Sequence, residues 1–306
     1  MSNTPQVPAY QLIDGYRRWP YLDPAIAHEA SKYEPQDEDV LLVTYPSSGT
    51  HWTKQIIALI LHRGESALNY VEFVRRGLSL EVYGPANVSK QPHPKLILSH
   101  FQLLRNNFNA KAKYVYVARN PWDCCVSYFN MCRTIPFFKF EKGSLEDFLD
   151  AFLTGGLGNG DYFEHVRDAY AHRNEPNVLF LTYEALKADT PGTILKLAYF
   201  LGDEYGKALE QDEDLLQKIL ERSSLEFMGR VLEPKASDLQ TIVEHFKDVN
   251  FTPCEISFKD RPNKFKTFRK GQVNTWKEYF TTEQAQRVQA RLQDVAPELC
   301  TLWDLV

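Results

Sequence analysis

The residues with the clearest chemical potential lie in the stretch VLLVTYPSSGTHW, which runs from residue 40 to residue 52. An apolar run ends at Pro46, which offers no N–H to a neighbouring strand. Three small residues follow, Ser47, Ser48 and Gly49, and they allow backbone amides to converge. A strand, a small-residue turn and a helix N-terminus together form an anion site, because unpaired N–H groups and the helix dipole point to the same place.

This turn differs from the loop of the common nucleotide-binding enzymes. Their pattern, G-x-x-x-x-G-K-[ST], needs an upstream glycine and a lysine, whereas Thr50 directly follows Gly49 here. Thr50 can cap a helix that begins near His51. An ordinary ATPase or GTPase is therefore not indicated. From this loop alone, a plain strand-to-helix turn and an anion site explain the residues about equally well.

A second strand-to-helix turn lies in VYVARNPWDCCVSYF, residues 115–129. Asn120 suits the N-cap of a helix and Pro121 suits its first position. Arg119 stands at the carboxyl end of the strand, where open α/β sheets bind their ligands. Ser127 comes about two turns into the helix. This stretch therefore offers a second group of anion-binding residues.

Two further stretches carry chemistry. LILSHF, residues 96–101, places His100 just after another apolar run. FRKGQVNTW, residues 268–276, brings Arg269, Lys270 and Gly271 together in one predicted loop. Cationic side chains beside a glycine can hold a phosphate through both the side chains and an exposed amide.

The elements that must position these residues follow a strand–helix alternation. Apolar runs at 40–45, 95–99, 113–118 and 178–183 do not alternate with polar residues, which is typical of strands buried on both faces of a parallel sheet. Helical patterns are predicted at 51–62, 121–133, 144–154, 160–172, 191–202 and 212–222. The fold class is therefore α/β, with a central, mainly parallel sheet flanked by helices.

Length and composition limit the organisation. The chain has 306 residues, 43% of them hydrophobic, and shows no repeat or low-complexity tract, so we expect a single domain over residues 1–306. Residues 233–270 read as a long lid or binding loop. No run of about 18 apolar residues occurs, so we expect no membrane span, and the N-terminus lacks the apolar core of a signal peptide.

Charge and cysteine content point to a cytoplasmic protein. The net charge of −5 argues against a nucleic-acid partner. The five cysteines have no metal-ligand spacing, and we expect free, mostly buried thiols in a reducing compartment. They are Cys124, Cys125, Cys132, Cys254 and Cys300.

Taken together, these stretches resemble the cytosolic sulfotransferase family. TYPSSGTHW is similar to its 5′-phosphosulfate loop, usually T-Y-P-K-S-G-T-x-W, and YVARNPWDCCVSY to its 3′-phosphate strand and helix. FRKGQVNTWKEYF is similar to its R-K-G-x-x-x-x-W-K segment, and LILSHF matches its K-[ST]-H segment in part. The blocks follow the family's order, and the resemblance covers the chain from about Tyr10 onward.

The resemblance implies a P-loop-like sulfotransferase fold and a metal-independent enzyme. It would move a sulfuryl group from 3′-phosphoadenosine 5′-phosphosulfate (PAPS) to a small acceptor, leaving 3′-phosphoadenosine 5′-phosphate (PAP). His100 would be the general base that takes the acceptor's proton. Residues 47–51 would hold the 5′-phosphate, and Trp52 would stack on adenine. The remaining implied nucleotide contacts are Arg119, Ser127, Tyr183, Ser223, Leu225, Arg269, Lys270 and Gly271.

Two departures from the family pattern concern catalysis. The loop lysine is replaced by Ser47, and a second lysine, two residues before the histidine, is replaced by Leu98. Losing one preorganised donor typically costs ~10²–10³ in rate. Either Ser47 or His51 compensates, or the enzyme is slow or narrow, or the protein binds the nucleotide with little or no turnover.

The resemblance leaves the acceptor and the assembly open. Aromatic residues near Trp19, Tyr21 and 135–140 suggest a small apolar or aromatic acceptor with a hydroxyl or amine, such as a phenol, a monoamine, a steroid or another alcohol. The family's dimerisation segment is only partly matched by KEYFTTEQAQ, residues 277–286, so a dimer is in doubt. A nucleotide kinase is a weak alternative, because no Walker lysine or acidic metal ligands occur.

Overall fold

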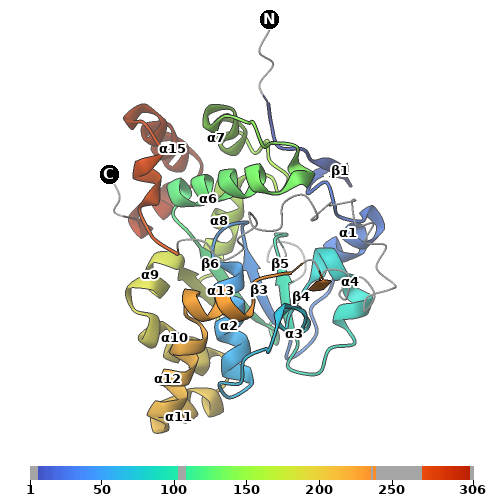
Figure 1. Ribbon diagram of the computed structural model, residues 1–306, viewed down its shortest axis with the longest axis vertical. Coiled ribbons are helices and arrows are strands. Elements are labelled where there is room, and N and C mark those ends of the chain that lie inside the picture. The colour runs from blue at the N-terminus through green and yellow to red at the C-terminus, as the bar shows by residue number, and fades with distance from the viewer. Residues whose placement is uncertain (1–5, 103–107, 236, 239–270, 304–306) are drawn as a thin grey trace, which may run out of the picture.

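The computed structural model describes residues 6–102, 108–235, 237–238 and 271–303. Its central sheet has five parallel strands in the order β4-β5-β3-β6-β7. These strands are β3 (Val40–Thr44), β4 (Leu78–Ser79), β5 (Leu96–Ser99), β6 (Lys113–Ala118) and β7 (Val178–Thr182). The predicted α/β fold with a parallel sheet is confirmed (Figure 1).

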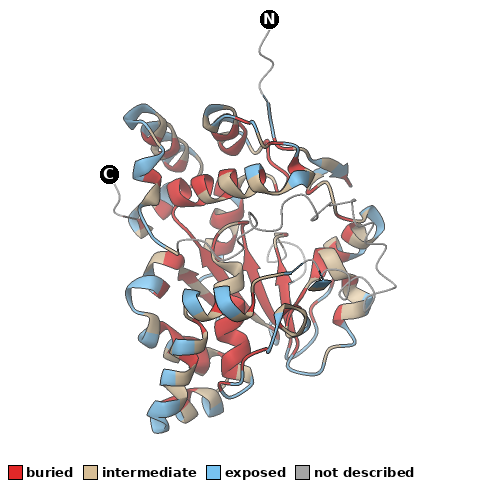
Figure 2. Cartoon of the chain, in the orientation of Figure 1, coloured by how far each residue is buried: buried red, intermediate tan, exposed pale blue. Residues whose placement is uncertain are grey.

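The two faces of the sheet are buried under different helices, because successive side chains of a strand point to opposite faces. Leu42, Leu98 and Val115 face a core shared with α2 (Thr50–Leu61), α10, α11 and α12. Leu41 and Ile97 face the other core, shared with α1, α4, α6, α7, α8 and α15. Figure 2 shows the strands buried between these two layers.

The remaining helices lie between and after the strands. They are α1 (Pro24–Ser31), α3 (Tyr70–Arg75), α4 (Leu80–Val88), α6 (Pro121–Thr134), α7 (Leu145–Leu153), α8 (Tyr162–Ala171), α9 (Tyr183–Ala188), α10 (Thr190–Leu201), α11 (Asp203–Gln211), α12 (Glu213–Arg222), α13 (Leu225–Val231) and α15 (Thr282–Val295). Short 3₁₀ turns are η1 (Pro136–Phe138), η3 (Thr275–Glu278) and η4 (Pro297–Leu302), and β1 (Gln11–Ile13) pairs antiparallel with β2 (Tyr16–Arg18).

The four predicted strands and six predicted helices are all present, with ends shifted by at most two residues. Asn120 caps α6 by accepting the Asp123 N–H at 2.8 Å, and Pro121 is its first residue, as predicted. The predicted cap of α2 is wrong. Gly49 is the N-cap and Thr50 is the first helical residue, because the Thr50 hydroxyl is engaged by Thr44 at 2.7 Å instead.

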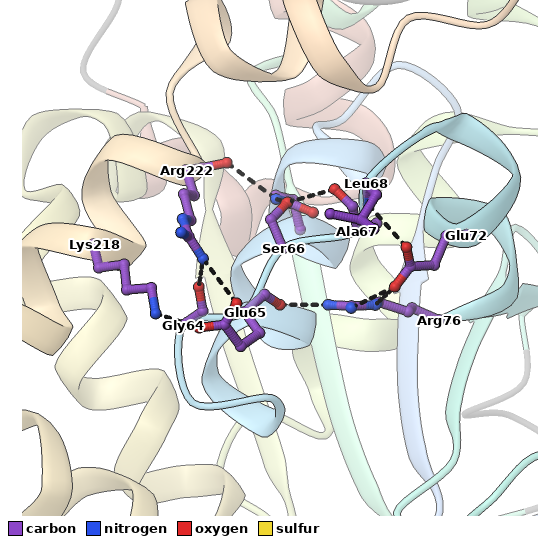
Figure 3. A network of polar contacts seen from close by, with 10 residues as sticks. Gly64, Glu65, Ser66, Ala67, Leu68, Glu72, Arg76, Lys218 and Arg222 are labelled. Atoms are coloured by element: carbon purple, nitrogen blue, oxygen red, sulfur yellow. Dashed lines mark hydrogen bonds and ion pairs between the residues drawn. The ribbon is translucent and has the colours of Figure 1, made fainter.

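A polar network fixes α3 against the far end of α2 (Figure 3). Glu65 forms ion pairs with Lys218 and Arg222 of α12, and its carbonyl accepts a hydrogen bond from Arg76. The Arg76 guanidinium also pairs with Glu72 of α3 at 2.6 Å. The segment between α2 and α3 is therefore held at both ends, and α3 has a defined place beside α2.

The cysteine prediction is confirmed within the described part of the chain, where Cys124, Cys125 and Cys132 are buried free thiols and Cys300 is a partly buried one. Cys254 lies outside the described residues, as does most of the loop predicted at 233–270. Among the residues that the structure describes, no helix is long and apolar enough to cross a membrane.

Candidate active site

Four predicted site segments meet at one edge of the sheet. The loop 45–49 follows β3, His100 follows β5, Arg119 follows β6 and Tyr183 follows β7. Because all of these strands are parallel, their carboxyl ends lie on the same side, where open α/β sheets bind ligands. The topology thus brings together residues that are more than 130 positions apart in the chain.

The loop after β3 has the backbone of an anion cradle. Ser47 and Gly49 both adopt positive φ angles, 66° and 102°, which turns the chain sharply into α2. No side chain caps the first turn of α2 in the described structure. A Cβ at Gly49 would lie 2.7 Å from Cδ2 of Tyr183, so only glycine fits this approach. The Tyr183 ring therefore packs directly against Gly49, and among the described residues no side chain accepts a hydrogen bond from the start of α2.

His100 is held in an orientation that suits a base. Its Nδ1 lies 2.8 Å from the Thr44 carbonyl oxygen, which can only accept a hydrogen bond. The neutral imidazole therefore carries its proton on Nδ1, and Nε2 has a free electron pair. The His100 backbone is also fixed, because its N–H donates to Glu81 at 3.0 Å and its carbonyl accepts from His165 Nε2 at 3.1 Å.

His165 is buried beside His100 and holds its backbone. The Tyr116 hydroxyl donates to His165 Nδ1 at 2.7 Å, which leaves Nε2 as the donor to the His100 carbonyl. Burial lowers the pKa of His165 to about 4, so the ring is neutral near pH 7. Tyr116 and His165 therefore orient the segment that carries His100 without adding charge.

Arg119 connects the anion loop to the C-terminal segment. Its guanidinium donates to the Ser47 carbonyl at 3.2 Å and to the Gln272 carbonyl at 3.0 Å, and it lies 4.6 Å from the centre of the Tyr183 ring. Arg119 Nε is buried and has no hydrogen-bond partner within the described residues. A buried cation with an unused donor is what an anion site needs.

Asp123 docks the C-terminal segment beside Arg119. Its carboxylate accepts from the N–H of Asn274 at 2.7 Å, from the N–H of Trp276 at 3.0 Å and from the hydroxyl of Thr275 at 3.1 Å. This carboxylate explains how residues 150 positions away reach α6. The sequence did not single out Asp123, although its place in the first turn of a capped helix was visible.

Of the remaining predicted nucleotide contacts, four lie close together near this junction: Gly271, Leu225, Tyr183 and Trp52. A Cβ at Gly271 would lie 3.2 Å from Leu225 and 3.7 Å from the Tyr183 hydroxyl, so these three residues are neighbours. The Trp52 ring lies 5.4 Å from the Tyr183 ring. Ser127 is partly exposed on α6, Ser223 is buried at the end of α12, and Leu225 is exposed at the start of α13. Arg269 and Lys270 lie outside the described residues.

Aromatic rings enclose the other side of His100. The Trp19 ring lies edge-on to His100 at 5.0 Å and is stacked on Tyr21 at 5.4 Å. Phe137 follows at 5.1 Å from Tyr21, and Phe138 lies 6.4 Å from Trp19. The predicted aromatic cluster near 19–21 and 135–140 therefore forms one group against the histidine.

His51 and Leu98 do not supply a positive charge to the site. Leu98 lies in the apolar core between β5 and α2. The pKa of His51 is lowered to about 3, mainly by desolvation and to a smaller extent by the charges of Lys54 and His100. The side chain keeps some exposure to solvent. A neutral His51 can form a hydrogen bond near pH 7 but cannot replace the charge of a lysine.

Lys54 is a buried cation that the sequence analysis missed. Its side chain is only 3% exposed, and its Nζ lies 4.2 Å from the Phe73 ring centre and 3.4 Å from the Val74 carbonyl. Burial lowers the pKa of Lys54 to about 7. One signal was visible in the sequence, since Lys54 is the only Lys, Arg, Asp or Glu in the helix THWTKQIIALIL. Among the described residues, no group of three or more His, Cys, Asp or Glu could hold a metal ion.

Comparison with known proteins identifies the family of this chain. A model of the sulfotransferase domain matches residues 37–299. An amine sulfotransferase of Oryctolagus cuniculus is 31% identical over 93% of this chain and 90% of its own length. A 3-alpha-hydroxysteroid sulfotransferase of Cavia porcellus is 35% identical over 87% of this chain and 86% of its own length.

Solved structures agree on the fold. Retinol dehydratase in a complex with retinol and PAP aligns with a TM-score of 0.68 at 21% identity, over 95% of this chain and 89% of its own. A mouse sulfotransferase complexed with PAP aligns with a TM-score of 0.66 at 22% identity, over 93% of both chains. The domain match and the relatives above 30% identity establish that this chain belongs to the sulfotransferase family and is an enzyme of that family.

Proposed function

We propose that this enzyme transfers a sulfuryl group from PAPS to a hydroxyl or amine of a small apolar or aromatic acceptor. The observation that carries the proposal is the orientation of His100, whose Nε2 is left as a free base by the 2.8 Å contact of Nδ1 with the Thr44 carbonyl. This base lies at the same sheet edge as the uncapped start of α2. A base and an anion cradle side by side are the two parts that group transfer requires.

The residues present fit PAPS. The first turn of α2 and the glycine approach at Gly49 suit a 5′-phosphate group, because backbone N–H groups and the helix dipole favour negative charge there. Arg119 has an unused buried Nε donor, and together with Ser127 and Gly271 it suits the 3′-phosphate. Trp52 and Tyr183 offer aromatic surface for adenine. The relatives bound to PAP support this assignment.

When bound, the donor supplies the sulfur atom: a bond forms from the acceptor oxygen or nitrogen to sulfur, the bond from sulfur to the 5′-phosphate oxygen breaks, and the electron pair stays on that oxygen. His100 Nε2 takes the acceptor's proton. The Thr44 carbonyl stabilises the imidazolium that results, since it already accepts from Nδ1 at 2.8 Å. Trp19 and Tyr21 orient an aromatic or apolar acceptor toward that nitrogen.

The nature of the acceptor is proposed at the level of a class. Phenols, monoamines, steroids and other alcohols all present a nucleophile on an apolar body. The relatives named for an amine and for a hydroxysteroid support both nitrogen and oxygen nucleophiles. We propose no metal and no nucleic-acid partner. The proposal includes no dimer contact through residues 277–286, because Thr282 and Gln286 replace the valine and glutamate of the family segment.

A second candidate function has one observation in its favour. Ser47 and Leu98 stand where lysines are usual, and Leu98 lies in an apolar core, so the protein could bind PAP with little or no turnover. Calorimetry with PAP and a transfer assay with radiolabelled PAPS separate the two. The acceptor panel comprises a phenol, a monoamine and a steroid alcohol.

We expect the native protein to bind PAP and to label at least one acceptor. His100→Ala should reduce the rate by ~10²–10⁴ while PAP still binds. His28→Ala, which changes an exposed histidine paired with Asp14, is the matched control and should keep the native rate. PAP binding without any labelled product would favour the second function, and an active His100→Ala would remove His100 from its role as base.

A further inference from the structure

Lys54 combines two properties that a structural lysine rarely has. Its side chain is 3% exposed, yet the described part of the structure gives it no carboxylate partner. Its contacts are the Phe73 ring at 4.2 Å and a long, 3.4 Å hydrogen bond to the Val74 carbonyl. Buried lysines are normally paired, because removing an ammonium group from water is costly. Lys54 therefore has the properties of a cation that binds an anionic ligand.

Lys54 lies near the N-terminal end of α2, the end that follows the anion loop. Helical side chains lean toward the helix N-terminus, so the Lys54 stem covers the turn that contains Thr50 and His51. The His51 ring and the Lys54 ammonium contact the same Phe73 ring, at 5.9 Å and 4.2 Å. The charges of Lys54 and His100 also both act on His51. Lys54, His51 and His100 are therefore one cluster at the reaction end.

Lys54 also stands beside the position where a lysine is missing. Leu98 faces the α2 side of the sheet, and a Cβ at Gly77 would lie 3.0 Å from its Cδ1 atom. The Gly77 N–H donates at 3.2 Å to the Val74 carbonyl, which is the same oxygen that Lys54 contacts. The Lys54 ammonium and the Leu98 side chain therefore both lie against the turn that follows α3.

We propose that Lys54 is a catalytic residue whose ammonium group supplies the positive charge that Ser47 and Leu98 cannot, and that it binds the 5′-phosphosulfate end of the donor. This inference rests on the proposed function. The Lys54 ammonium stabilises the electron pair left on the 5′-phosphate oxygen when the bond to sulfur breaks, while His100 receives the acceptor's proton. His51, neutral between the two, keeps their charges apart.

The first test compares two ligands by calorimetry, PAP and adenosine 3′-phosphate, which lacks the 5′-phosphate. Lys54→Met should weaken PAP about tenfold or more and leave adenosine 3′-phosphate unchanged, since only PAP presents the anion that Lys54 meets. Lys207→Met, an exposed lysine on α11, is the control for both ligands. An equal loss for both ligands would mean that Lys54 only supports the fold, and would overturn the proposal.

The second test reads Lys54 itself. In protein labelled with ¹³C at lysine Cε, the resonance of Lys54, assigned by its absence in Lys54→Met, reports the pKa of the ammonium. Binding of PAP should raise that pKa by about one unit or more, because an opposite charge within about 4–6 Å favours the charged form. A pKa that PAP does not move would overturn the proposal even if the enzyme is active.

The third test is turnover with rescue. Lys54→Met should lower kcat by ~10²–10³. Adding Ser47→Lys, which returns a lysine to the loop, should restore at least about a tenth of the kcat that was lost. A Lys54→Met rate within about threefold of the native rate would refute the role. If the native protein binds no PAP at all, the proposed function fails and this inference with it. If it binds PAP and turns over while the Lys54 tests fail, only this inference is wrong.

Discussion

The replacement of Lys54 by methionine should make the folded protein more stable near neutral pH. Burial lowers the pKa of Lys54 from 10.5 to about 7, so the unfolded chain binds this proton more tightly than the folded chain does. Stability rises with pH wherever the unfolded state holds more protons. The penalty from Lys54 is therefore largest below pH 7, shrinks as the pH rises, and is gone above about pH 10.5.

The size of this penalty follows from the two pKa values. At pH 7, proton linkage between 10.5 and about 7 amounts to roughly 4 kcal/mol, and at pH 8.5 it amounts to roughly 3 kcal/mol. Methionine has a similar length and carries no charge, so it removes the penalty. The free energy of unfolding of the native protein should therefore rise toward that of Lys54→Met by roughly 1–2 kcal/mol between these two pH values.

The assay is urea unfolding of both proteins at pH 7 and pH 8.5, followed by tryptophan fluorescence. Other groups titrate in this range, but they do so in both proteins, and the difference between the two proteins isolates Lys54. A constant gap between the proteins from pH 7 to pH 8.5 would refute the reasoning, because it would mean that Lys54 has the same pKa folded and unfolded.

Lys95 provides the matched control. It is also 3% exposed, but its Nζ lies 3.5 Å from Asp39 and 2.8 Å from Gln36. Lys95→Met leaves the Asp39 carboxylate buried without its cation and should lower the free energy of unfolding by roughly 3 kcal/mol. Replacement by methionine is thus expected to raise the free energy of unfolding at Lys54 and to lower it at Lys95, although both lysines are equally buried. The difference in sign follows from the carboxylate beside Lys95.

Three further predictions concern the site. Gly49→Ala should weaken PAP about tenfold or more by calorimetry, since its Cβ meets Tyr183 at 2.7 Å, whereas Gly15→Ala, with a similar φ of 80° and nothing within 4 Å, should keep native affinity. Asp123→Ala should lower the free energy of unfolding by roughly 3 kcal/mol in urea titrations, because three donors of residues 274–276 lose their acceptor. His165→Ala should lower kcat about tenfold without changing PAP affinity, and His165→Gln, which keeps a donor for the His100 carbonyl, should recover part of the rate; equal rates in the two variants would contradict the positioning role.

The strands and the anion loop could be predicted because their signals are local. The runs that became β3, β5, β6 and β7 are mostly apolar and do not alternate with polar residues, which is typical of strands covered on both faces. Asn120 and Pro121 mark the start of α6 by capping chemistry that involves only neighbouring residues. His100 and Arg119 could be placed at one edge from the strand ends alone, since parallel strands end together.

The parts that the sequence left open depend on tertiary contacts. Thr50 has the right side chain for a cap, but its hydroxyl is engaged by Thr44, so Gly49 takes the cap position. Lys54 reads as one polar residue of an ordinary helix. Its burial by Phe73, with no carboxylate partner among the described residues, depends on where α3 lies, and the contacts of Glu65 with Arg76 and α12 fix that position.

A lysine on α2 and a lysine on the loop differ in their protonation before the donor binds. A loop lysine is solvated and carries its proton before any ligand arrives. Lys54 is desolvated, and near pH 7 only about half of the side chains hold the proton in the free protein. Binding of an anion shifts this balance toward the charged form, and by linkage the proton in turn strengthens binding of the anion. The buried position therefore lowers the stability of the free protein. It also makes the positive charge on Lys54 depend on binding of the donor.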